Sequence, residues 1–201
     1  MEACTFQRPP FRVPRAVLRA VSIALVCALS FAVAAVHADS YDDRRVRAGA
    51  RLFRSMLAAH TTLERRADAK GVLQVVVYGE PGGAKAKEIA ALIAPADPAK
   101  AAVRGLPLAV RTMSTLPQGG EPVAGVFLAA SPNAADLDRL VAWGIANGVI
   151  VYSPFEGHVE RGVAGGLAIE AKVQPYVNLR TLEAAGIELK PFFLKVAKVQ
   201  R

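Results

Sequence analysis

Residues 72–78, VLQVVVY, are apolar at nearly every position. A run of this kind is typical of a strand that is buried on both faces of a parallel sheet. It is followed by a loop that contains Gly79, Gly82 and Gly83, and then by a helical pattern over 84–94. Strand, glycine-rich turn and helix in that order also build dinucleotide and phosphate sites. This stretch therefore constrains the fold first and the candidate functions second.

Strand and helix patterns continue to alternate along the chain. Apolar runs at 106–113, 123–130 and 148–153 predict three more strands. Ser131 and Pro132 offer an N-cap and a first helical position, and the predicted helix then runs to Asn147 and carries the apolar stripe Leu137, Leu140, Val141 and Ile145. This order predicts the α/β class: a single layered domain with a mainly parallel sheet flanked by helices.

The C-terminal part changes character. Residues 165–179 contain two short extended pieces, which predict a hairpin or edge strands. Asn178 can cap a short helix that ends near Ala185, and Pro191 can open a last helix carrying Phe192, Val196 and Val199.

An amphipathic helix is predicted within residues 39–70 and is expected to pack on the domain. Its apolar stripe consists of Val46, Ala50, Phe53 and Leu57. Arginines surround this stripe, so the helix could instead dock on a partner or on an anionic membrane. For that surface the candidate partner-binding residues are Arg47, Arg51, Phe53 and Arg54.

Residues 1–38 have the layout of a secretory signal. Four arginines precede the apolar run 20–36, and Val36-His37-Ala38 offers a cleavage site. Export to the periplasm is therefore expected, with an uncleaved membrane anchor as the alternative. Both cysteines, Cys4 and Cys27, lie in this segment, so the mature chain could form no disulfide.

The whole chain has a net charge of +8. Removal of residues 1–38 would leave 21 basic against 16 acidic side chains. Because these charges are scattered and aromatic residues are few, we expect a solvated basic surface and no binding to nucleic acid.

The C-terminal third resembles the YfiR-like family of exported bacterial proteins. The matching stretches are Gly165–Ile169, Tyr176–Leu179, Glu183–Ile187 and Phe193–Val199, and weaker likeness begins near residue 72. The domain is accordingly placed at 71–201. Pro175-Tyr176 stand where the family has F-E, and the family's aromatic N-terminal segment is replaced by RLFRSMLAAH.

The resemblance implies a small periplasmic regulator in cyclic-di-GMP signalling. Such a protein restrains a membrane-bound diguanylate cyclase by docking on its periplasmic sensor domain. It is not an enzyme and needs no cofactor, and its affinity for the partner can respond to a small ligand. Exposed edge strands would also permit a homodimer.

Side chains suited to catalysis are few. After removal of residues 1–38 only His60 and His158 could serve as bases. His60 is expected at the boundary of the first helix. His158 lies between Glu156 and Glu160, where a solvated loop is preferred over a cation site, so no metal is predicted.

The glycine loop is the strongest candidate site. In an open α/β sheet, ligands bind beyond the carboxyl ends of strands where the winding reverses, and helix N-termini there favour anions. The predicted ligand residues are Gly79, Glu80, Gly82, Gly83, Ser131 and Asn133. The loop lacks nucleotide-motif spacing, so a simple tight turn is preferred. The alternative function is a periplasmic protein that binds a small anionic solute.

Overall fold

The computed structural model describes residues 43–118 and 120–201. The predicted signal segment and both cysteines lie outside the described residues. Residues 43–59 are helical. The other helices are η1 (Leu63–Arg66), α2 (Ala84–Ile93), α3 (Ala134–Asn147), α4 (Leu179–Ala184) and α5 (Pro191–Val196).

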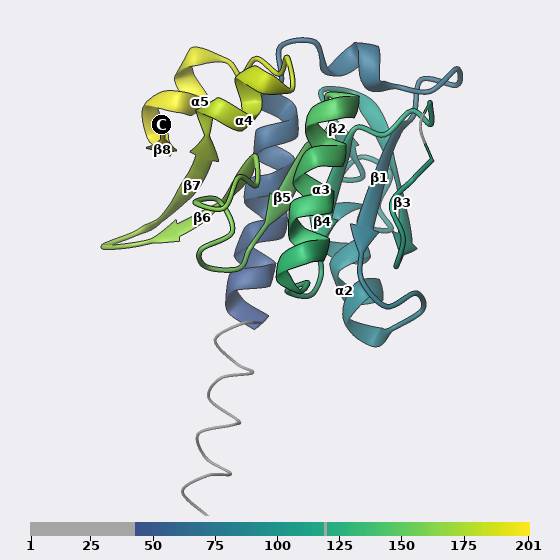
Figure 1. Cartoon of the computed structure of the whole chain (residues 1–201). Coiled ribbons are helices and arrows are strands. Elements are labelled where there is room, and N and C mark those ends of the chain that lie inside the picture. Colours follow the sequence, from purple (N-terminus) through teal and green to yellow (C-terminus); the bar gives the residue numbers. More distant parts are fainter. Residues whose placement is uncertain (1–42, 119) are drawn as a thin grey trace, which may run out of the picture. The chain divides into compact units, whose positions relative to one another are not determined.

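In the described part, eight strands form one sheet in the order β2-β3-β1-β4-β5-β6-β7-β8 (Figure 1). Their bounds are β1 Leu73–Tyr78, β2 Ala102–Val103, β3 Leu106–Met113, β4 Gly125–Leu128, β5 Ile150–Ser153, β6 Gly165–Ile169, β7 Val173–Asn178 and β8 Lys198–Gln200. The pairs from β3 through β6 are parallel, and so is β7 with β8. Strands β2 and β3, and β6 and β7, pair antiparallel. The predicted α/β class with a mainly parallel sheet is confirmed.

The winding of the sheet reverses beside β1. From β1 the chain passes through α2 to β3 on one side, and then returns to β4 on the other side. Strands β1 and β4 are therefore neighbours at a topological switch point, the place where open α/β sheets bind ligands.

The two faces of the sheet carry separate cores. Val75 and Val77 pack with helix 43–59 and α2, whereas Val76 packs with α3. Successive side chains of a strand point to opposite faces, so a continuous apolar run serves both cores. Figure 1 shows α3 in front of the sheet and helix 43–59 behind it.

Helix 43–59 is part of the core. Phe53 is fully buried, and its ring centroid lies 5.7 Å from that of Phe127 and 5.5 Å from that of Tyr152. Gly125 makes room for it, because a Cβ on that glycine would lie 2.7 Å from Phe53 Cζ. The apolar stripe of this helix thus faces the sheet.

Two predicted boundaries are wrong. The last helix ends at Val196, and Lys198–Gln200 form β8, because Val199 pairs with Val177 at the sheet edge. Helix α3 is capped by Asn133, whose side chain accepts a hydrogen bond from Asp136 N, and not by Ser131. The predicted hairpin at β6–β7 and the Asn178 cap of α4 are confirmed.

Candidate functional site

The loops that follow β1 and β4 lie side by side. Gly79 N donates to Met113 O and Ala129 N donates to Tyr78 O, both at 2.9 Å. A Cβ on Gly79 would lie 3.1 Å from Ala129 Cβ. The two loops that were predicted to share one crevice are therefore adjacent.

The glycine loop itself has the geometry of a tight turn. Gly82 has φ +77°, a conformation that glycine adopts without strain. Gly83 precedes α2, and its N–H donates to Glu80 O at 3.2 Å. The carbonyl of Glu80 closes the turn, and these contacts account for Gly82 and Gly83 without a ligand.

A pocket of about 360 Å³ opens at the same edge of the sheet. It lies between the end of β1, the segment after β3 and the first turns of α3, and it is lined by Tyr78, Ser114, Thr115, Leu116, Asp136, Arg139 and Leu140. The six predicted ligand residues are not among these. Asn133 reaches the pocket indirectly, through Asp136. Sequence reasoning missed the pocket because residues 114–116 belong to no regular element.

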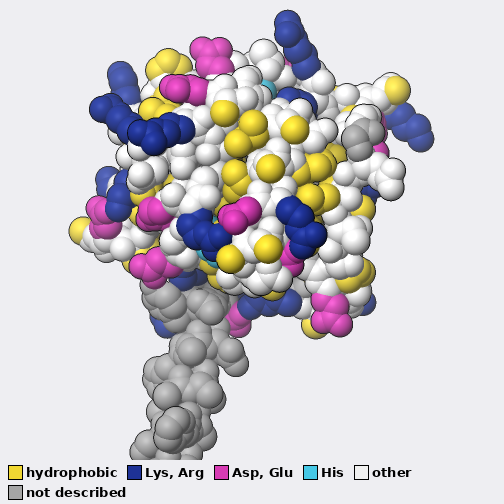
Figure 2. All heavy atoms as spheres, in the orientation of Figure 1, with side chains coloured by type: hydrophobic (Ala, Val, Ile, Leu, Met, Phe, Trp, Pro, Cys, Tyr) yellow, Lys and Arg dark blue, Asp and Glu magenta, His cyan; other side chains and the backbone are white. Residues whose placement is uncertain are grey.

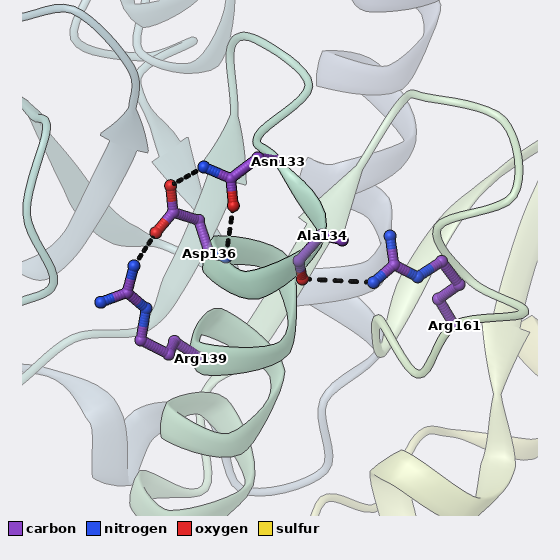
Figure 3. A network of polar contacts seen from close by, with 5 residues as sticks. All are labelled: Asn133, Ala134, Asp136, Arg139 and Arg161. Carbon is purple, nitrogen blue, oxygen red and sulfur yellow. Dashed lines mark hydrogen bonds and ion pairs between the residues drawn. The ribbon is translucent and has the colours of Figure 1, made fainter.

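Charged side chains at the start of α3 form a small network (Figure 3). Asn133 Nδ2 donates to Asp136 Oδ2 at 2.7 Å, while Asp136 N donates to Asn133 Oδ1 at 2.9 Å. Arg139 pairs with the other carboxylate oxygen of Asp136. Asp136 and Arg139 both line the pocket, so it holds one carboxylate and one guanidinium that are paired with each other, and the Arg139 side chain is 73% exposed.

Three polar side chains lie together beyond β4 and β5. Ser153 Oγ is 2.8 Å from His158 Nδ1, and His158 Nε2 is 3.1 Å from Ser131 Oγ. Ser153 and His158 are buried and Ser131 is exposed. Burial, followed by the charge of Arg161, lowers the pKa of His158, and Glu160 opposes the shift. The prediction of a solvated His158 loop is wrong, since this imidazole is a buried connection between two hydroxyls.

The directions of these hydrogen bonds depend on the tautomer of His158. Ser153 Oγ also accepts from Phe155 N at 3.2 Å, and its hydroxyl can donate to His158 Nδ1, which places the imidazole proton on Nε2 and directs it to Ser131. In the other tautomer, Nδ1–H donates to Ser153 and Nε2 accepts from Ser131. Pro132 follows Ser131 and lacks the N–H that would follow a serine nucleophile in an oxyanion hole.

The remaining histidine is also buried. His60 is 2% exposed, and its Nδ1 accepts a hydrogen bond from Thr62 N at 3.1 Å. Burial lowers its pKa, as do the nearby charges of Arg66 and Arg104. Over residues 43–118 and 120–201, no group of three or more His, Cys, Asp or Glu side chains is placed to hold a metal ion.

The four predicted partner-binding residues have different surroundings. Phe53 is buried in the core and is not available to a partner in this fold. Arg54 donates to the carbonyls of Ile93 and Ala102, at 2.8 and 3.0 Å. Arg47 pairs with Glu88 on α2, at 2.9 Å, and Arg51 is exposed. Arg54 thus stabilises the end of α2, a role that its position in the sequence does not reveal.

Comparison with known proteins gives matches among solved structures. No protein-family model and no curated protein matches the chain. Among solved structures it is similar to the ABC domain in complex with L-Trp from Streptococcus pneumoniae, with a TM-score of 0.44 and 13% sequence identity. The match covers 72% of this chain and 62% of that one, so this chain spans less than two thirds of the length of the solved structure.

In the part of the chain that the structure describes, no helix has the length and apolar character needed to cross a bilayer.

Proposed function

We propose that this protein is a non-enzymatic binding protein that holds a small anionic molecule in the pocket beside the switch point. The observation that carries the proposal is the position of Arg139. Its guanidinium borders a pocket at the carboxyl edge of the sheet, on the first turns of α3. Because Asp136 engages only part of the guanidinium, the remaining N–H groups of Arg139 can bind an anion, and the positive end of the helix dipole favours one there.

The other lining residues restrict the ligand. Tyr78, Ser114 and Thr115 supply hydroxyl groups, whereas Leu116 and Leu140 supply apolar contacts. At about 360 Å³ the pocket is near the lower end of the range for ligand sites, roughly 300–1,000 Å³. A small carboxylate with a short apolar body and a hydrogen-bonding group fits this lining.

Catalysis is not part of the proposal. Ser131 is hydrogen-bonded to His158, but it is followed by Pro132, which supplies no N–H to an oxyanion hole, and this disfavours nucleophilic attack by Ser131.

Calorimetric titration of the purified protein with a panel of small carboxylates tests the proposal. We expect Arg139→Gln to weaken binding by about tenfold or more, because a charge-assisted hydrogen bond contributes roughly 1.5–3 kcal/mol. Arg180→Gln, at an exposed arginine on α4, is the matched control and should bind normally. Equal affinities for the Arg139 and Arg180 variants would refute the pocket assignment.

The regulatory role remains a second proposal. It rests on the resemblance over residues 165–199, a segment that includes β6, β7, α4 and α5 at the outer end of the sheet. In this proposal the exported protein restrains a membrane signalling protein through its periplasmic domain. Recovery of such a protein with the tagged chain from solubilised membranes, and its release by the bound carboxylate, would support both proposals together.

A further inference from the structure

The large apolar side chains that the described part leaves exposed form two pairs, which lie on separate elements at the outer end of the sheet. They are Ile169 and Val173 on the β6–β7 hairpin, exposed by 41% and 50%, and Phe192 and Val196 on α5, exposed by 63% and 56%. We call these four residues the outer patch. We propose that the outer patch contacts the surface of an anionic lipid membrane.

The hairpin pair and helix α5 lie on the same face of the sheet. Leu167 points toward helix 43–59, since its Cδ2 lies 3.3 Å from where a Cβ on Gly49 would be. Ile169 is two residues further along β6 and so shares that face, and Val173 is its register partner on β7. Helix α5 lies over the same face, because Phe193 belongs to the core cluster of helix 43–59.

The hairpin extends past the neighbouring strands. Pairing of β5 with β6 reaches only Gly166, and pairing of β8 with β7 begins only at Tyr176. Beyond these residues the two strands pair only with each other, and Figure 1 shows them as an arm that leaves the sheet. A two-stranded ribbon is marginally stable in water by itself. An apolar environment at its tip would stabilise it.

Lysines accompany both apolar pairs. Lys172 precedes Val173 in the arm, and Lys195 lies between Phe192 and Val196 on α5; both are exposed. The acidic residue of the arm, Glu170, is paired with Lys198 at 3.0 Å. In Figure 2, Lys and Arg side chains lie at the upper left with Asp and Glu side chains beside them. Apolar side chains flanked by lysines match an anionic bilayer, where the rings and methyl groups enter the interface and the ammonium groups reach the head groups.

A neighbouring groove differs from the outer patch because acidic side chains border it. A pocket of about 290 Å³ between α4 and α5 is bordered by Glu183 and Glu188. Helix α5 contributes Pro191 and Leu194 to it, and at 100° per residue these fall on a different side of the helix from Phe192 and Val196. The acidic groove and the α5 side chains of the outer patch therefore lie on different sides of that helix.

Binding of the full chain to vesicles tests the proposal. Phosphatidylglycerol and phosphatidylcholine vesicles are compared by sedimentation and by hydrogen exchange, which locates the contact even if another segment also binds lipid. We expect slower exchange over the arm and α5 with phosphatidylglycerol only. The double variant Phe192→Ser and Val196→Ser should lose this protection and bind about tenfold more weakly. Lys195→Ser should weaken vesicle binding less than the double variant does. Added salt should remove the difference in binding between Lys195→Ser and the parent chain.

Matched controls keep the result interpretable. Ala142→Ser, at an exposed position of α3, and Lys87→Ser, at an exposed lysine of α2, should leave vesicle binding unchanged. The proposal is overturned if α5 gains no protection on anionic vesicles, or if the double variant keeps the protection of the parent chain over the arm and α5. It is also overturned if sedimentation velocity without lipid shows a dimer that the double variant abolishes, since the outer patch would then be an interface between copies.

Discussion

The ring of Phe53 occupies the space that a side chain on Gly125 would fill. Phe53 Cε2 and Cζ lie 2.9 and 2.7 Å from the position of a Cβ on that glycine. The ring also contacts Phe127 and Tyr152, so it has little freedom to move away. A methyl group on Gly125 would therefore be overpacked against this ring.

Gly125→Ala should destabilise the protein by about 1–3 kcal/mol, the usual cost of overpacking a core. Urea unfolding of the parent and the variant measures the change. Phe53→Leu replaces the ring with a smaller side chain. In a double-mutant cycle, Gly125→Ala should therefore destabilise the Phe53→Leu background less than it destabilises the parent. Strictly additive effects of the two substitutions would show that the ring and the glycine are not in contact.

Tyr152→Phe should leave stability unchanged or raise it by up to about 1 kcal/mol. The Tyr152 hydroxyl is buried and has no hydrogen-bond partner among the described residues, and burial raises the pKa of this phenol. Removing a buried hydroxyl that forms no hydrogen bond recovers its desolvation cost. Tyr176→Phe is the control and should be destabilising, because that hydroxyl donates to Gln200 Oε1 at 2.8 Å. A loss of more than about 1 kcal/mol in Tyr152→Phe would indicate a partner for the hydroxyl.

Stability should fall as the pH is lowered through the range in which histidines titrate. The pKa values of His158 and His60 are lowered in the folded protein, mainly by burial. Between the folded value and the unfolded value of about 6.5, the unfolded chain binds more protons. The two neutral histidines therefore make their full contribution to stability above about pH 6.5. This contribution is lost as the pH falls through their lowered pKa values in the folded protein.

Urea unfolding at several pH values between about 5.5 and about 7.5 measures this dependence, above the range in which most carboxylates titrate. His158→Gln should reduce the slope of unfolding free energy against pH, because one of the two titrating groups is removed. A slope that is unchanged in this variant would contradict burial of a neutral His158.

Asn133→Ala should destabilise the protein by about 1 kcal/mol, since it removes the N-cap of α3. Asn133→Ser retains a capping oxygen and should cost much less. The alanine variant also releases Asp136 from the amide of Asn133, so carboxylate binding should change in the same samples. Equal stabilities of the alanine and serine variants would contradict the capping role.

The elements at the centre of the sheet were predictable from sequence, whereas the surroundings of the polar side chains were not. The run from Leu73 to Tyr78 is buried on both faces, and its β-branched composition predicts this directly. The strand at Lys198–Gln200 is too short for a periodic pattern, and it depends on pairing with β7. Its valine fits a helical stripe equally well, which is why the last helix was predicted too long.

The candidate site was likewise predictable only in part from the sequence. Adjacency of the loops after β1 and β4 follows from strand order, which alternating patterns can predict. The hydrogen bonds of His158 connect its loop to Ser153 at the end of β5 and to Ser131 in the loop after β4, and no local pattern reports on such contacts. The predicted cap at Ser131 failed for a related reason, since its oxygen lies against the imidazole and Asn133 caps the helix in its place.

The position of Phe53 also affects the order in which the chain can fold. Helix 43–59 is made early during synthesis, yet the rings that cover Phe53 belong to β4 and β5, which emerge much later. Until β5 has left the ribosome, this helix carries an uncovered apolar stripe and the core on that face remains open. The core on that face therefore closes only when segments that are distant in the chain come together.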